Sequence, residues 1–182
     1  AVVIGVPLGL FMGWYPKVNL MVRPLFDAIR PIPPIAWIPI SIIWIGLGED
    51  AKIFLIFLAS FCYVTLNAWN GVKNVDQQLV GAARMLGARD HQIFITIILP
   101  ACVPSIFAGL QVALSSSWAT VLAAEMVRSS NGLGWVIIAG MNNNDMLQIL
   151  VGIVAIGIVG LVLSIIFRKV EAVLCRWNKS GT

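Results

Sequence analysis

Five apolar segments without a charged side chain constrain this fold more than any other feature of the sequence. They cover residues 1–14, 34–47, 53–68, 97–124 and 147–167. A helix needs about 20 predominantly apolar residues to cross the ~30 Å hydrocarbon core of a bilayer. The segments are continuous rather than alternating, which argues against a transmembrane barrel. We therefore predict an all-α, polytopic transmembrane helical bundle of about five spans, forming a single domain over residues 1–182.

Two of the five segments are short for a span. Residues 1–14 open directly in apolar sequence, with no initiator Met and no basic region before them. At 1.5 Å per residue they cover only about two thirds of the hydrocarbon core, so we expect the tail of a spanning helix in a truncated chain. Residues 34–47 contain Pro39, and we expect this segment either to draw on neighbouring residues or to be shielded by other helices.

The positive charges predict the orientation, because connectors rich in Lys and Arg stay in the cytoplasm. Residues 14–33, 67–95 and the tail after 167 carry ten Lys and Arg, whereas 48–52 and 125–146 carry two. We therefore predict that the first set of connectors, including the C-terminus, is cytoplasmic. The ten are Lys17, Arg23, Arg30, Lys73, Arg84, Arg89, Arg168, Lys169, Arg176 and Lys179.

The loop over residues 76–100 is a charged island between apolar segments. Asp76 is a good N-cap, Gly87 suits a left-handed C-cap, and Asp90 can cap the next helix. Between the caps, apolar residues at helical spacing form one stripe: Leu79, Ala82, Ala83 and Leu86. The pattern predicts a cytoplasmic helix–turn–helix. From the residues alone, a membrane-surface helix or a plain connector is about equally compatible with it.

A longer spacing pattern narrows this choice. Ala82-Ala83, Gly87, Ile97 and Leu99-Pro100 resemble the EAA motif of ABC importer permeases, with Gly81 in place of its glutamate. The segments RPIPPIAWIPI (30–40), SSSWATVLAAEM (115–126) and NGLGWVI (131–137) are typical of the nitrate, sulfonate, taurine and bicarbonate branch. The resemblance implies a permease subunit of an ATP-driven importer for a small anionic or organic solute.

In that family the motif forms a coupling helix that docks in a groove of a cytoplasmic ATPase. The resemblance therefore implies these ATPase-coupling residues: Gly81, Ala82, Ala83, Arg84, Gly87, Arg89 and Asp90. Gly81 removes a charged contact, so coupling is expected to rely more on Arg84, Arg89 or Asp90. The implied partners are two ATPase subunits, a second and identical permease copy, an extracytoplasmic solute-binding protein and membrane lipid, in the bacterial cytoplasmic (inner) membrane.

Polar residues in the middle of segment 97–124 are candidates for the translocation path. Ser115, Ser116, Ser117 and Trp118 either allow close helix packing or line the route of a small anion. Glu125 either pairs with Arg128 three residues on or shapes an outer gate. Both alternatives stay open for the serine and tryptophan residues and for Glu125.

The sequence offers no set of residues for catalysis. It has no GxxxxGK[ST] phosphate loop, and the spacing of Cys62, Cys102 and Cys175 matches no metal site. His91 beside Asp90 suits a solvated or capping role, and no basic stripe with interleaved aromatics indicates nucleic acid. We expect a non-catalytic chain that binds no cofactor or metal, with ATP and Mg²⁺ on the partner ATPase.

Two other classes of protein are alternatives to an ABC permease. A secondary transporter or channel without an ATPase predicts charged or histidine residues within the spans for ion coupling, and the five segments carry no Asp, Glu, Lys, Arg or His. A membrane anchor for a signalling complex would also use a cytoplasmic helix–turn–helix. Co-purification of an ATPase would separate the ABC permease from both of these alternatives.

Overall fold

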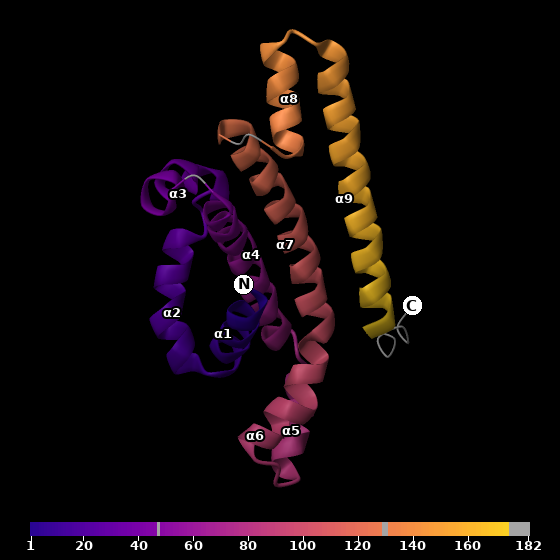
Figure 1. Cartoon of the computed structure of the whole chain (residues 1–182). Helices are drawn as coiled ribbons and strands as arrows, with labels where there is room; N and C mark the ends of the chain where they lie inside the picture. The colour runs from indigo at the N-terminus through magenta and orange to yellow at the C-terminus, as the bar shows by residue number, and fades with distance from the viewer. Residues whose placement is uncertain (47, 129–130, 175–182) are drawn as a thin grey trace.

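The computed structural model describes residues 1–46, 48–128 and 131–174, without the side chains of residues 128 and 174. Within these ranges every regular element is a helix, as predicted, and no strand occurs. Figure 1 shows the elements in order: α1 (Val2–Trp14), α2 (Pro16–Ile29), the 3₁₀-helix η1 (Pro34–Trp37), α3 (Ile38–Ile45), α4 (Glu49–Lys73), α5 (Gln77–Met85), α6 (Asp90–Ile93), the π-helix η2 (Phe94–Ile98), α7 (Leu99–Arg128), α8 (Leu133–Asn142) and α9 (Met146–Leu174).

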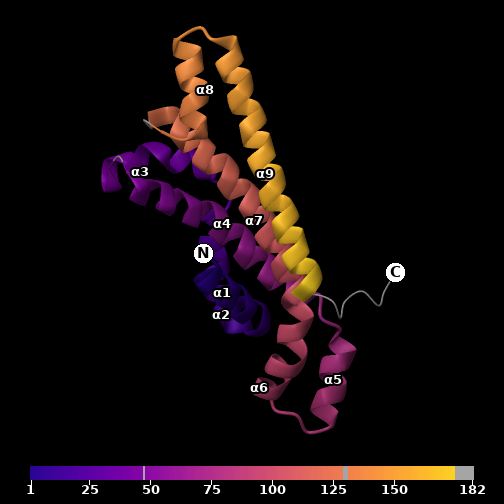
Figure 2. The same ribbon diagram turned by 45° about the vertical axis from the view of Figure 1, so that its right-hand side comes forward.

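Three helices are long and apolar enough to cross a membrane: α4, the continuous stretch Asp90–Val127 that contains α7, and α9. They contain the predicted segments 53–68, 97–124 and 147–167, which are thereby confirmed as long apolar helices. Helices α4 and α7 pack along each other, and α9 runs back beside α7 (Figure 2). Helix α1, from the first predicted segment, packs against α4.

The segment at residues 34–47 draws on neighbouring residues, which is one of the two alternatives predicted for it. Helix α3 has only eight residues and follows the four-residue η1, and residue 47 lies outside the described ranges. Helix α2 and the stretch Pro34–Ile45 together are apolar and long enough to cross, with a bend of 80° between them. The physical reason is the proline cluster at residues 31–34, because proline lacks the N–H that a continuous helix needs.

The connectors at 14–33 and 125–146 differ from expectation, because each contains a helix. Helix α2 starts on the side of the molecule nearer to α5 and α6 and rises towards α3 (Figure 1). Helix α8 is joined by a tight turn to α9, and the two helices pack antiparallel (Figure 1). In that turn Asn144 has φ 52°, and Asp145 Oδ1 accepts hydrogen bonds from the N–H groups of Leu147 and Gln148 at 3.0 and 3.1 Å.

Small residues allow the helices of the core to approach closely. On α1, a Cβ added at Gly9 would collide with the Thr65 carbonyl and the Ala68 methyl of α4, and one at Gly13 would lie 2.5 Å from Val72 Cβ. On α7, a Cβ at Gly109 would lie 2.5 Å from Asn67 Cβ of α4. Such glycine-mediated contacts are typical of helices that associate within a bilayer.

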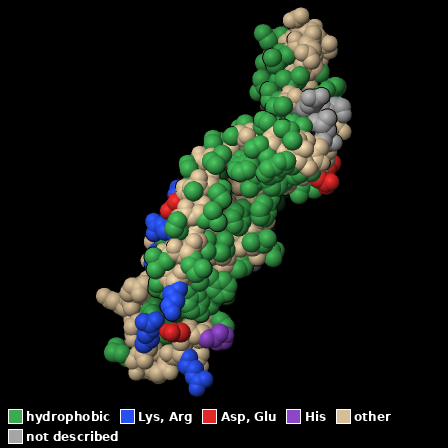
Figure 3. Space-filling view, turned by 90° about the vertical axis from the view of Figure 1, so that its left-hand side faces the viewer, with side chains coloured by type: hydrophobic (Ala, Val, Ile, Leu, Met, Phe, Trp, Pro, Cys, Tyr) green, Lys and Arg blue, Asp and Glu red, His purple; other side chains and the backbone are tan. Residues whose placement is uncertain are grey.

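The outer surface is largely apolar. Figure 3 shows hydrophobic side chains over the middle of one face, with charged side chains concentrated towards the end that carries α5 and α6. Only 6% of the residues in the most apolar stretch of α9 are buried within the chain. Such a surface is stable only against lipid or other protein.

Candidate functional site

The loop over residues 76–100 folds into a helical hairpin, α5–turn–α6, at one end of the molecule (Figure 2). Asp76 is the N-cap of α5, as predicted: its Oδ1 accepts a hydrogen bond from the Gln78 N–H at 2.8 Å. This bond satisfies one of the N–H groups that the first turn of a helix leaves free. The start of the hairpin is therefore fixed by a local contact.

Gly87 ends α5 in the left-handed region, with φ 83°, as predicted. Its N–H donates to the Arg84 carbonyl at 3.0 Å, and the Ala88 N–H donates to the Ala83 carbonyl at 3.0 Å. These two bonds form a Schellman motif, in which glycine avoids the steric cost that a side chain incurs at positive φ. The turn therefore depends on the absence of a Cβ at this position.

The predicted cap of the second helix is wrong by one residue. Arg89, not Asp90, is the N-cap of α6, and its N–H donates to Gln92 Oε1 at 2.8 Å. Asp90 instead accepts an ion-pair contact from Arg84, with Nη2 and Oδ1 3.2 Å apart. Both side chains are more than half exposed, so the pair contributes at most about 1 kcal/mol, but it joins the two arms of the hairpin.

Helix α5 divides its apolar residues between two faces, which the single predicted stripe did not anticipate. Val80 is buried and Ala83 is half-buried against the same cluster, facing the chain. Ala82 is exposed, and Leu79, Met85 and Leu86 are 58%, 86% and 89% exposed. Leu79 and Leu86 thus belong to an outward face, which we call the outer face of the hairpin, with Ala82 and Met85.

One buried cluster joins the hairpin to the rest of the chain. It extends from α1 and α4 through α5 to α7: Leu10, Ala68, Val72, Val75, Val80, Ile93, Ile98 and Cys102. Aromatic rings support it, since Phe94 stacks on Phe11 at 6.0 Å and lies 6.2 Å from Trp14. The Arg84 guanidinium carbon lies 5.9 Å from the centre of the Trp14 ring. A displacement of the hairpin would therefore be resisted by α1, α4 and α7 together.

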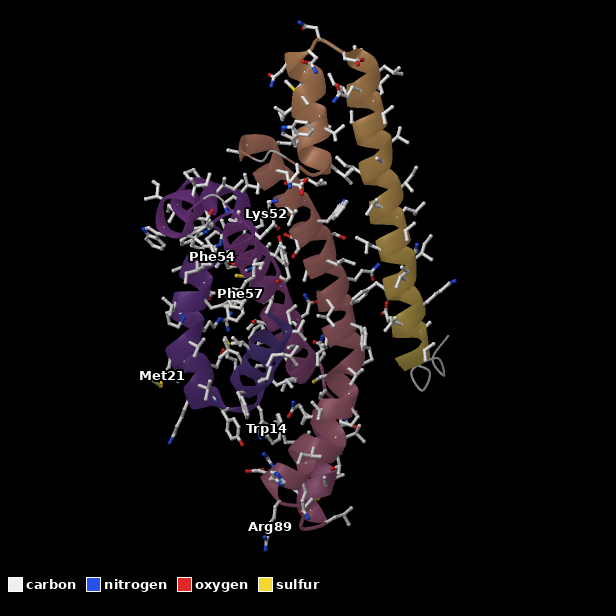
Figure 4. The ribbon with its side chains drawn as sticks, in the orientation of Figure 1. Trp14, Met21, Lys52, Phe54, Phe57 and Arg89 are labelled. Carbon is white, nitrogen blue, oxygen red and sulfur yellow. The ribbon has the colours of Figure 1, made fainter. Side chains whose placement is uncertain are left out.

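The remaining predicted coupling residues, Gly81 and Arg89, have few constraints from the chain itself. A Cβ added at Gly81 would meet nothing within 4 Å. Arg89 is exposed at the tip of the hairpin, and its side chain extends away from the molecule (Figure 4). Both positions are available to a partner.

The predicted path residues on α7 do not form one polar wall. Ser115 is exposed and its Oγ donates to the Gln111 carbonyl at 3.3 Å, whereas Ser117 is 9% exposed. Ser116 is half-buried, and its carbonyl accepts from Thr120 Oγ1 at 2.8 Å. Trp118 faces α9, since a Cβ added at Gly160 would lie 3.3 Å from its Nε1. Trp118 thus packs on α9, whereas Ser117 Oγ is buried without a hydrogen-bond partner in the described part of the chain, and the path role of these residues stays a prediction.

Glu125 stabilises the start of α8. Its Oε2 accepts a hydrogen bond from the Gly134 N–H at 2.9 Å, where the positive end of the helix dipole favours a carboxylate. A Cβ at Gly132 would collide with this carboxylate, so the approach is close. The Arg128 side chain lies outside the described residues, and its pairing with Glu125 stays a prediction.

Glu125→Ala is expected to lower the free energy of unfolding by about 1 kcal/mol, the typical loss for a removed helix cap. Glu125→Gln keeps a carbonyl oxygen that accepts the Gly134 N–H, and it should lose less than half as much. Thermal unfolding of the purified protein in nanodiscs compares the two. Equal midpoints for alanine, glutamine and the parent would contradict this role of Glu125.

Comparison with known proteins identifies the class of protein. Residues 5–177 match the family described as binding-protein-dependent transport system inner membrane component. The chain belongs to this family. It is therefore related to multi-pass membrane proteins of transport systems, in agreement with its long apolar helices.

Individual relatives and a solved structure agree with this assignment. The chain is 41% identical over 177 residues to a putative ABC transporter permease protein of Methanocaldococcus jannaschii, covering 97% of this chain and 66% of that protein. It is 37% identical to the taurine transport system permease protein TauC of Escherichia coli, covering 98% of this chain and 65% of TauC. The chain thus spans slightly less than two thirds of either relative. A chain of the inward-facing MetNI methionine ABC transporter shares its fold, with TM-score 0.75 and 18% identity, covering 94% of this chain and 86% of that one.

Sequence reasoning missed two arginines, because it placed Arg23 and Arg30 in a cytoplasmic connector. In the structure both line a cavity together with Thr65, Leu66 and Trp69 of α4. The signal available in the sequence was the spacing of Arg23 and Asp27, four residues apart as on one helix face. That spacing supports a helix where the charge count alone indicates a loop.

Proposed function

We propose that this chain is the transmembrane permease subunit of an ATP-driven ABC importer for a small anionic or organic solute. The observation that carries the proposal is the α5–α6 hairpin, whose outer face stays exposed while its inner face joins the buried cluster. The family match supports it, as do relatives named for taurine, aliphatic sulfonate, nitrate and bicarbonate transport. Each of those solutes contains a sulfonate group or is an oxyanion.

The outer face would dock in an apolar groove of a separate ATPase subunit, as amphipathic helices do in other helix-in-groove complexes. Because Val80 and Ile93 join α5 and α6 to α1, α4 and α7, movement of the docked hairpin would reach the spanning helices. ATP-driven closure of two ATPases would then alternate the access of the path. The permease contributes contacts that differ between the two states.

The hairpin and the end of α9 lie towards the same end of the molecule (Figure 1). We place this end in the cytoplasm of a bacterial cell, as the distribution of Lys and Arg suggests. A second, identical permease copy would complete the path, and an extracytoplasmic solute-binding protein would deliver the solute. The mostly uncovered α9 leaves apolar area for lipid and for such a copy.

Leu86→Glu tests the docking step. Leu86 is 89% exposed, so the substitution leaves the packing of the chain unchanged but would bury a carboxylate in the partner's groove. We expect the amount of permease that co-purifies with a tagged ATPase to fall by about tenfold or more, because an unpaired buried charge is costly. Leu86→Met is the volume-conserving control and should retain full co-purification.

Equal recovery of Leu86→Glu and Leu86→Met with the ATPase would refute docking through the outer face. Uptake of solute that continues in proteoliposomes without ATPase and ATP would instead support a secondary transporter or channel. The two measurements therefore separate a wrong docking surface from a wrong class of transporter.

A further inference from the structure

We propose that the break between α2 and η1 is a binding station for a monovalent oxyanion within the membrane, with the Arg30 guanidinium as its anion-binding group. The inference rests on the proposed transport function and names a place and a chemistry for the solute on its path. Nothing in the family match or in the names of the relatives assigns a role to this residue.

Arg30 lies at the depth of the middle of a spanning helix. It is the C-cap of α2, and it lines a cavity with Cys62, Tyr63 and Leu66, which are midway along α4 (Glu49–Lys73). A charged side chain at such depth is costly and is a functional-site candidate by default. Broken helices near the middle of the bilayer form the solute sites of many transporters.

Within the described residues the Arg30 guanidinium makes no hydrogen bond or ion pair. Arg23, seven residues earlier in the chain, has such partners. Its Nε lies 3.3 Å from Asp27 Oδ2, and its guanidinium carbon is 4.9 Å from the centre of the Trp69 ring. Asp27 is thus engaged by Arg23, whereas Arg30, which lines the same cavity as Asp27, has no ion-pair partner within 4 Å among the described residues. A role of Arg30 as a structural ion-pair partner is therefore not supported.

The space beside Arg30 is large enough for a small solute. The cavity that it shares with Cys62 has a volume of about 150 Å³, well above the ~10–15 Å³ that holds one water molecule. Among the described residues that line it, Arg30 supplies the only charge, and Trp37 and Tyr63 supply aromatic surface. A smaller cavity that Arg30 also lines contains Trp69, whose indole N–H is buried without an acceptor in the described part of the chain.

These features select the class of ligand. A guanidinium donates two parallel hydrogen bonds to two oxygens of a carboxylate-like or sulfonate-like group. One positive charge balances one negative charge, so a monovalent oxyanion leaves no net charge in the cavity, whereas a divalent anion does. The Arg30 side chain is exposed, so an anion can reach it, and the apolar part of the cavity wall strengthens the attraction.

Cys62 provides a reporter inside the cavity. The permease is prepared in nanodiscs in a Cys102→Ala/Cys175→Ser background, so that Cys62 is its remaining thiol. Its rate of modification is measured with anionic sulfonatoethyl methanethiosulfonate and with the cationic trimethylammonium analogue. We expect the anionic reagent to react about tenfold faster relative to the free thiol, the effect of one neighbouring charge in partly desolvated surroundings. Methanesulfonate should slow the modification, and neutral dimethyl sulfone should not.

Arg30→Gln should abolish both the charge preference and the protection by methanesulfonate. The matched control is Lys17→Gln, which removes an exposed cation of the same helix that lines neither cavity beside Arg30, and it should retain both. Equal rates for the two reagents in the parent would overturn the proposal without any variant. The proposal can therefore be refuted even if Arg30→Gln folds poorly. An unchanged preference in Arg30→Gln, or an equal loss in the control, would overturn it as well.

The measurement needs neither an ATPase nor ATP. A charge preference at Cys62 together with a failed docking test would show that the anion station exists on a different class of transporter. Successful docking without a charge preference would leave the permease assignment intact and remove the station.

Discussion

Gly87→Val is expected to abolish ATP-driven uptake while the chain still inserts in the membrane. At φ 83° a β-branched side chain is a strong steric outlier, so the turn that closes α5 would have to change its backbone. The bonds from Gly87 to Arg84 and from Ala88 to Ala83 would be lost, and the outer face would no longer be held at a fixed angle. Uptake in proteoliposomes, relative to the amount of permease recovered, should fall at least about tenfold when ~1–3 kcal/mol of strain disrupts the turn.

Gly81→Ala is the matched control on the same helix. A Cβ there meets nothing within 4 Å, and alanine favours a helix over glycine by about 1 kcal/mol, so α5 should be retained or stabilised. Gly87→Asn should keep partial activity, because asparagine tolerates the left-handed region better than valine. Coupled uptake at the parent level by a well-inserted Gly87→Val protein would contradict the role of the turn.

Gly9→Leu is expected to have the second large effect, on the fold rather than on coupling. A side chain at Gly9 would collide with the Thr65 carbonyl and the Ala68 methyl, and Ala68 is fully buried. Overpacking of a close-packed interface typically costs about 1–3 kcal/mol, and here backbone meets backbone. Helix α1 should separate from α4, which lowers the thermal midpoint and increases protease sensitivity.

Gly157→Leu is the control for this substitution, because it places the same side chain on α9 where a Cβ meets nothing within 4 Å. We expect it to leave the thermal midpoint within about 2 °C, as for substitutions at exposed sites. If Gly9→Leu and Gly157→Leu unfold at the same temperature, the close approach of α1 and α4 does not stabilise the protein.

The long helices could be predicted from the sequence because a length of uncharged apolar sequence is a direct physical requirement for a span. The caps at Asp76 and Gly87 could also be predicted, since each depends on contacts within a few residues. The faces of α5 could not be predicted, because periodicity groups Leu79 with Ala83. Only packing into the buried cluster selects Val80 as the buried residue. The family resemblance carried the functional interpretation, and the family match confirmed the family.

The contribution of α2 to the broken span was not predicted, because charge counting treats every arginine as a marker of a loop. Arg23 is tolerated on α2 through Asp27 one turn away, and Arg30 lies at a proline-rich break that hydropathy does not distinguish from a loop. Helix α8 was missed because its ten residues lie between polar turns, and its start depends on Glu125 from another helix. Contacts between distant segments decide these cases.

The central claim is that the outer face of the α5–α6 hairpin binds an ATPase. A photo-reactive residue at Met85 tests it most directly, with Met21 on α2 as a control, because the two side chains are 86% and 82% exposed. Met21 lies on a different element, away from the hairpin (Figure 4). We predict a cross-link to the ATPase from Met85 and none from Met21. No cross-link from Met85 in the assembled complex, or equal cross-links from both positions, would contradict the account.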